Sequence, residues 1–234
     1  HSSAPELKGS SPLGCGLYYD KSEELKSMME TIETPFGPCH VLLDNNAKEY
    51  LDFYRKSEEF SKKRREIAAK EIFGDYVKIV NRTHQGLLNF NEVVLGAHYL
   101  DNSEKNLYPI ALRADLPAYI IEGVPNLSED IIESIGFSSR AEKLGVYERL
   151  VKANILPHGG GYTFPDLLNV VDVMEVNTNR FFVVDMQSGI GKKIFLTPND
   201  IQFTYRGRQV IVSTFELKLG KLRARLTPEF VLKI

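Results

Sequence analysis

Cysteine is scarce in this sequence. The 234 residues include two cysteines, Cys15 and Cys39, and each stands next to glycine or proline in a segment that we expect to be a loop. So few cysteines exclude a scaffold held together by several disulfides. A single disulfide is sterically possible, but nothing in the sequence indicates it, and we expect two free thiols. The low cysteine count favours a reducing intracellular compartment or a virion as the location of the protein.

Long apolar runs are also missing. The longest apolar stretches, such as Val170 to Val176, are interrupted by acidic residues and are far shorter than the roughly 20 residues of a membrane-spanning helix. With 43% hydrophobic and 26% charged residues, the chain has the composition of an ordinary globular protein. We therefore expect one large or two small folded domains and no insertion into a membrane.

Recognisable catalytic motifs are absent as well. His158 and the glycines that follow it look like the glycine-rich oxyanion strip of lipases and esterases. Such enzymes also need a G-x-S-x-G nucleophile elbow further along the chain, and the sequence has none. The histidines His40, His84, His98 and His158 have no ligand spacing such as H-E-x-x-H, so we assign no metal site, although a zinc site built from distant segments stays open. The sequence therefore leans away from an enzyme and predicts no cofactor.

Positive charge is concentrated at the C-terminal end. Residues 191–234 hold nine Lys and Arg against three Asp and Glu, whereas residues 1–190 hold 20 against 28. Apolar and charged residues alternate from Phe215 to Leu226, which predicts a terminal hairpin with one basic face. Four cations would line that face, and we expect them to bind a partner: Lys218, Lys221, Arg223 and Arg225. An acidic protein surface is favoured over nucleic acid, because no aromatic residues stand between the cations.

The pattern along the chain predicts an α+β protein. Residues 1–19 are rich in glycine and proline and predict an extended N-terminal arm. Residues 20–160 predict a helix-rich α+β region with a few strands, including a long helix near 47–73. From residue 161 to residue 234 the pattern predicts an antiparallel β-sheet or small barrel that contains the basic hairpin.

The long helix has an unusually narrow apolar stripe. Phe53, Phe60 and Ile67 recur every seven residues, and the residues from Ser61 to Glu66 between them are polar. Such a stripe is typical of a coiled-coil contact or of a peripheral helix. We expect these three side chains to contact a partner, although a surface helix resting on its own sheet is an equal alternative.

One hairpin offers an enzymatic alternative. Asp166, Asp185 and Gln187 stand at the ends of two strands predicted around Thr178, an arrangement in which nucleases hold Mg²⁺ and orient water. In the expected register Asp185 faces Val171 and points away from Asp172, so convergence of two acids on one ion is not clearly predicted.

The sequence thus favours a non-enzymatic assembly or adaptor subunit over a catalyst. Its arm and long helix would contact neighbouring subunits in a homo- or hetero-oligomer, and its basic hairpin would bind an acidic partner. A viral or phage particle is one setting for such a subunit. A metal-dependent nuclease and a simple nucleic-acid-binding protein are the alternatives.

Overall fold

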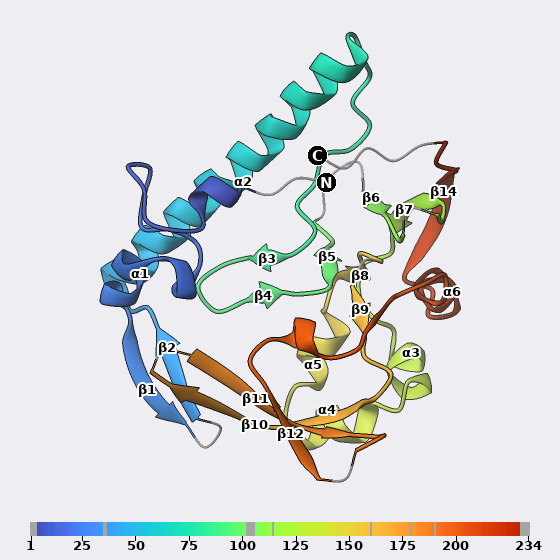
Figure 1. Cartoon of the computed structure of the whole chain (residues 1–234). Helices are drawn as coiled ribbons and strands as arrows, with labels where there is room; N and C mark the ends of the chain where they lie inside the picture. Colours follow the sequence, from blue (N-terminus) through green and yellow to red (C-terminus); the bar gives the residue numbers. More distant parts are fainter. Residues whose placement is uncertain are drawn as a thin grey trace. The chain divides into compact units, whose positions relative to one another are not determined.

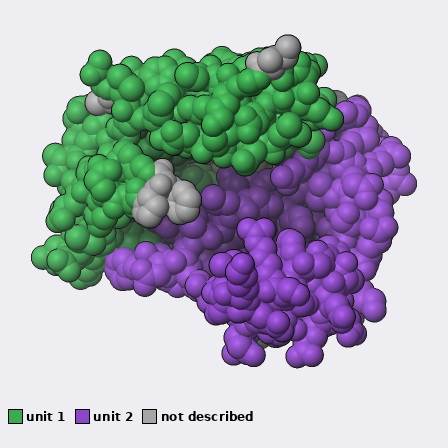
Figure 2. Space-filling view, turned by 90° about the horizontal axis from the view of Figure 1, so that it is seen from below, with its two compact units in different colours: residues 1–76, 162–204 green, residues 77–161, 205–234 purple. Residues whose placement is uncertain are grey.

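Helices and antiparallel strands are mixed along the chain (Figure 1), which confirms the predicted α+β class, and the N-terminal half is rich in helix. The computed structural model describes residues 4–34, 37–101, 106–113, 115–159, 161–177, 179–189 and 191–229. The chain divides into two compact units, which Figure 2 distinguishes by colour. Unit 1 comprises residues 1–76 and 162–204, and unit 2 comprises residues 77–161 and 205–234.

Unit 1 begins with short elements that lead into a long helix. In chain order these are η1 (Pro5–Leu7), η2 (Tyr19–Lys21), α1 (Glu23–Met28), β1 (Glu30–Thr34) and β2 (Gly37–Val41). Helix α1 begins at Glu23 because the Ser22 hydroxyl caps it and accepts a hydrogen bond from the Leu25 amide at 3.0 Å. Strands β1 and β2 pair antiparallel with each other.

Helix α2 (Asp44–Phe73) confirms the long helix predicted near 47–73. Its 30 residues extend about 45 Å. The helix ends at Gly74, whose positive φ of 68° is accessible because glycine has no side chain to clash. Among the described residues, no helix combines the length and the apolar character needed to cross a bilayer.

A three-stranded antiparallel sheet forms the rest of unit 1. It consists, in spatial order, of β10 (Leu167–Val176), β11 (Asn179–Met186) and β12 (Lys192–Phe195), and η3 (Pro198–Asp200) follows it in the chain. Its buried side chains Val184 and Met186 pack with Ile201, which comes just after η3. Asn177 takes a positive φ of 49° in the turn between β10 and β11, as Asn tolerates more readily than most residues.

Unit 2 is built around another three-stranded antiparallel sheet. Its spatial order is β14 (Gly220–Leu226), β7 (Ala118–Gly123) and β6 (Leu107–Ile110). The described residues of this unit include four short helices: α3 (Glu129–Ser134), α4 (Ser138–Lys143), α5 (Tyr147–Val151) and α6 (Gln209–Glu216). The core of the unit joins sheet residues such as Ile110 and Ile121 to helix residues such as Ile132 and Ile211.

Short two-stranded ladders complete the structure. They pair β3 (Gly86–Leu87) with β4 (Val93–Val94), β5 (Ala97–Tyr99) with β8 (Ile155–Pro157), and β9 (Tyr162–Thr163) with β13 (Thr204–Tyr205). The β5–β8 ladder brings two segments about 60 residues apart in sequence into register, with His98 opposite Leu156.

The C-terminal basic hairpin predicted from the sequence does not form. The segment before Leu222, where we expect a strand from Gln209 to Leu219, forms helix α6 over Gln209–Glu216, and β14 pairs with β7 instead. Ile211 and Phe215 lie four residues apart on α6 and pack on the core of unit 2. Burial of this apolar helical face therefore outweighs the β-propensity of the segment.

Candidate functional site

The first half of the α2 stripe is covered by the protein's own N-terminal arm. Phe53 is 6% exposed and packs with Leu7, Cys15 and Leu25 in one buried cluster. At Gly14 a Cβ atom would lie 2.4 Å from the Phe53 ring, so the arm passes directly over this side chain. Phe53, predicted to contact a partner, is thus buried within unit 1.

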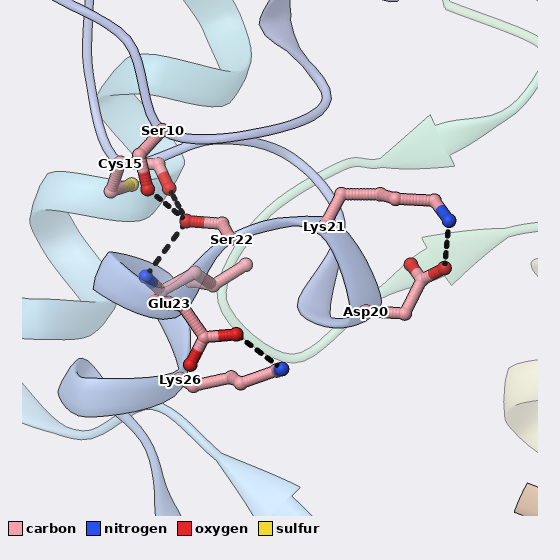
Figure 3. A network of polar contacts seen from close by, with 8 residues as sticks. Ser10, Cys15, Asp20, Lys21, Ser22, Glu23 and Lys26 are labelled. Carbon is pink, nitrogen blue, oxygen red and sulfur yellow. Dashed lines mark hydrogen bonds and ion pairs between the residues drawn. The ribbon is translucent and has the colours of Figure 1, made fainter. Parts of the chain in front are cut away.

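Ser22 fastens the arm to the start of α1. Its hydroxyl is buried, donates to the Cys15 carbonyl, and lies 2.7 Å from the Ser10 hydroxyl (Figure 3). The same oxygen accepts the amide hydrogen of Leu25, so one side chain connects two arm positions with one helix. The arm therefore packs against the rest of unit 1. That it also contacts a neighbouring subunit stays a prediction.

The second half of α2 emerges from beneath the arm. Phe60 is 38% exposed, and the Arg64 guanidinium lies 4.9 Å from its ring centre while pairing with Glu6 of the arm. Beyond this ion pair, Ile67 is 63% exposed and Phe73 is 67% exposed. Figure 1 shows these C-terminal turns of α2 extending past the arm.

The emerging segment of α2 is basic as well as apolar. Residues 60–73 carry five Lys and Arg against two Glu, a net charge of +3. The whole chain has a net charge of −2, so the remainder carries −5. Lys63 and Lys70 are exposed and seven residues apart, so they lie on one side of the helix. We call residues 60–73 the α2 tip.

A shallow cavity lies between the arm and the first half of α2. Its volume is about 360 Å³, and it is lined by Leu13, Gly14, Cys15, Asn45, Lys48, Glu49, Asp52, Phe53 and Lys56. Burial, and then the carboxylates of Glu24 and Glu49, raise the pKa of the Cys15 thiol. A thiol held protonated in this way is a poor nucleophile, so the cavity offers no activated cysteine.

In the acidic hairpin of unit 1, the carboxylate of Asp166 is bonded to Ser188. Both carboxylate oxygens of Asp166 accept hydrogen bonds from Ser188, from its hydroxyl and, at 2.8 Å, from its amide. The Gln187 amide donates to the Asp166 carbonyl at 2.7 Å. Asp166 thus closes the end of the strand pair, which is a structural use of its carboxylate.

The register of this hairpin differs from the expected one. Irregularities in β10 place Asp185 opposite Asn169 rather than Val171, and Asp172 opposite Val183. Asp185 also faces Lys192 on the neighbouring strand. Among the described residues, no three His, Cys, Asp or Glu side chains are arranged to hold a metal ion. The nuclease interpretation with Mg²⁺ stays a prediction.

The basic residues of the C-terminal end do not form one continuous face. In β14, Lys221 is opposite Glu122 and Arg225 is opposite Tyr119, and an irregularity between Leu222 and Ala224 puts these two cations on opposite faces. Arg223 forms an ion pair with Glu122. Lys218 is exposed in the turn after α6, with a φ of 53°.

Acidic side chains gather around Tyr147 on the short helices of unit 2, where residues 129–152 carry five Asp and Glu and four Lys and Arg, and Glu148 pairs with Lys152. Partial burial raises the pKa of the Tyr147 hydroxyl, and four carboxylates raise it further: Glu129, Glu142, Glu133 and Glu148. Exposed apolar side chains stand on either side of α4, where Phe137 precedes the helix and Leu144 follows it. We call this group of carboxylates and apolar residues the α3–α5 face.

Three histidines from distant segments meet in unit 2. The rings of His84 and His158 are 4.7 Å apart between centres, and those of His84 and His98 are 6.3 Å apart. His98, on β5, is 1% exposed, and its Nε2 atom lies 2.9 Å from the Pro109 carbonyl. Its Nδ1 atom is buried with no hydrogen-bond partner among the described residues.

The histidine cluster borders a network of charged groups. Arg82 donates from Nη1 to both carboxylate oxygens of Asp101 at 2.8 Å, and its guanidinium lies 4.5 Å from the centre of the Tyr108 ring. The Tyr108 hydroxyl donates to Asn106 at 2.8 Å and lies 3.2 Å from Asp101. Burial raises the pKa of Tyr108 to about 12. His40, the remaining histidine of interest, belongs to unit 1 and contacts Glu175 at 3.2 Å.

No family model, curated protein or solved structure matches this chain. The function therefore has to be inferred from the arrangement of its own residues.

Proposed function

We propose that the protein is a non-enzymatic assembly subunit that binds a neighbouring subunit through the α2 tip. The observation that carries this proposal is the contrast between the two halves of one helix. Phe53 is buried under the arm, whereas Ile67 and Phe73 are more than 60% exposed. Large apolar side chains exposed on a helix are typical of a surface that another protein covers.

The partner that we propose is a second copy of this chain. Two α2 tips, each with a net charge of +3, would repel one another if they paired symmetrically. A tip placed on a different, acidic surface of the next copy gains both electrostatic attraction and apolar burial. Contacts of this head-to-tail type propagate from copy to copy and build rings or filaments.

The α3–α5 face has the chemistry that such a tip needs. It combines four carboxylates with the exposed apolar side chains of Phe137 and Leu144. Charge complementarity and apolar contact therefore support this face of one copy as the place that receives the α2 tip of another. The basic residues of β14 give less support to a partner surface, because Arg223 is already paired with Glu122.

Charge reversal tests the proposal. We expect the double variant Lys63→Glu, Lys70→Glu to lower the mass measured by light scattering towards that of the monomer. The double variant Glu133→Lys, Glu142→Lys should do the same. An equimolar mixture of the two double variants should recover association, because each reversed tip then meets a reversed face.

The matched control for the variant Lys63→Glu, Lys70→Glu is Lys192→Glu, Lys193→Glu. It makes the same change in net charge on exposed positions of β12. This control should associate like the natural sequence. A natural sequence that is monomeric at low and at high salt would contradict self-assembly itself. If both charge-reversal variants keep the oligomer mass of the natural sequence, the α2 tip and the α3–α5 face are not the contact surfaces.

A further inference from the structure

In the described part of unit 2, two cations, Arg82 and Arg206, lie near the histidine cluster. His98 packs against His84, against Tyr108 on β6, and beside Arg82. Arg206 adds a further positive charge near His158, and its guanidinium lies against Gly161. The carboxylate of Asp101 borders the cluster, but two hydrogen bonds from Arg82 occupy it.

The hydrogen bonding of His98 suits a neutral ring. A carbonyl oxygen can only accept, so the contact with Pro109 makes Nε2 the protonated nitrogen. Nδ1 then carries the lone pair. A second proton on Nδ1 would create a buried cation beside other imidazoles and Arg82, and the neighbouring carboxylate of Asp101 is already bonded by Arg82.

The ionisation behaviour agrees with this geometry. Burial lowers the pKa of His98, the hydrogen bond to the Pro109 carbonyl raises it, and the nearby His158 and Arg82 lower it further. Burial likewise lowers the pKa of His158, and Arg206 contributes in the same direction. Both rings therefore take up protons at a lower pH in the folded unit than in the unfolded chain.

We propose that the cluster of His84, His98 and His158 is an acid-sensitive latch that holds unit 2 closed at neutral pH and releases it under mildly acidic conditions. Release here means opening of the β5–β8 ladder, which carries His98 and directly precedes His158. Unit 1 has no such cluster among its described residues, and its His40 faces the carboxylate of Glu175. This proposal does not rest on the assembly proposed above.

The size of the effect follows from proton linkage. The stabilisation is fully present above the unfolded pKa of about 6.5 and is lost as the pH falls towards the lowered folded value. If His98 stays neutral in the folded state, the opening equilibrium constant rises about tenfold between pH 7.5 and pH 5.5. His158 adds up to a similar factor, so the combined change is at most about 100-fold.

The experiment is hydrogen exchange of the full chain, followed by peptide at pH 7.5 and at pH 5.5 and corrected for the intrinsic pH dependence of exchange. We expect peptides that contain β5 and β8 to lose protection at the lower pH by about tenfold or more. The variant His98→Gln keeps a donor for the Pro109 carbonyl but cannot titrate. It should show a pH response about tenfold smaller than the natural sequence.

The variant His40→Gln is the control and should respond to pH like the natural sequence. Equal pH responses in the natural sequence and in His98→Gln would overturn the proposal. If His98→Gln does not fold, imidazole NMR of the natural sequence decides. A His98 ring that titrates near pH 6.5 while β5 stays protected overturns the latch, and a ring that stays neutral until β5 opens supports it.

Discussion

Truncation of the two phenylalanines on α2 should have very different effects. Phe53 and Phe60 are the same residue type on the same helix stripe, yet Phe53 is 6% exposed under the arm and Phe60 is 38% exposed. Phe53→Ala removes a buried ring and leaves a cavity beneath Gly14, a change that typically costs about 3–5 kcal/mol. Phe60→Ala removes a partly exposed ring and its stacking with Arg64, for which we expect a cost of about 1 kcal/mol.

Urea unfolding followed by far-UV circular dichroism measures both costs. A second readout is limited proteolysis, because loss of Phe53 should free the arm and make residues 4–18 susceptible to cleavage, while Phe60→Ala should leave the arm protected. Equal destabilisation by the two substitutions, or an arm that stays protected in Phe53→Ala, would refute the idea that the arm is anchored on the first half of the stripe.

Two other predictions concern single polar groups. Ser22→Ala removes the buried hydroxyl that joins the arm to α1 and should lower the free energy of unfolding by about 1–2 kcal/mol in urea, whereas the exposed neighbour Ser27→Ala should change it little. Tyr108, with a pKa of about 12, should ionise last in a spectrophotometric titration, and Tyr108→Phe should remove that step. Because the folded pKa is raised, the stabilisation is present below pH 10 and is lost as the pH rises towards 12. A step already complete near pH 10 would contradict burial of the hydroxyl.

The long helix could be predicted from the sequence because its signals are local. A run of good helix formers ends at Gly74, and that pattern needs no information from distant residues. The sequence does not show which part of the apolar stripe on this helix is covered. Phe53 and Ile67 look equivalent in the sequence, and only the path of the arm, set by Gly14 and Ser22, separates a buried position from an exposed one.

The prediction of a basic C-terminal hairpin was wrong for two physical reasons. Residues 209–216 are rich in β-branched residues, which favour strands, but Ile211 and Phe215 become buried only when the segment is helical. In β14, one extra residue between Leu222 and Ala224 reverses the faces of all the residues that follow. Alternation in a sequence cannot reveal such an irregularity.

The histidine cluster carries no sequence signal at all. His84 lies in a loop, His98 on β5 and His158 just after β8, so their separations fit no ligand motif. They meet because the β5–β8 ladder pairs residues about 60 positions apart. The tertiary pairing of two short strands, which sequence periodicity does not predict, therefore creates the most distinctive group of titratable side chains in unit 2.

Cations that are close in the sequence form one basic surface only if the fold also places them close together. The C-terminal cations are dispersed: Lys192 lies in unit 1, Arg206 lies near His158, and Arg223 is neutralised by Glu122. In the α2 tip Arg64 is likewise paired with Glu6, but the exposed Lys63 and Lys70 lie on one side of a continuous helix, of which the 14 tip residues occupy about 21 Å. Although the C-terminal segment has the larger net charge in the sequence, the α2 tip is the basic surface that can attract a partner as a unit, and charge reversal there should have the larger effect on association.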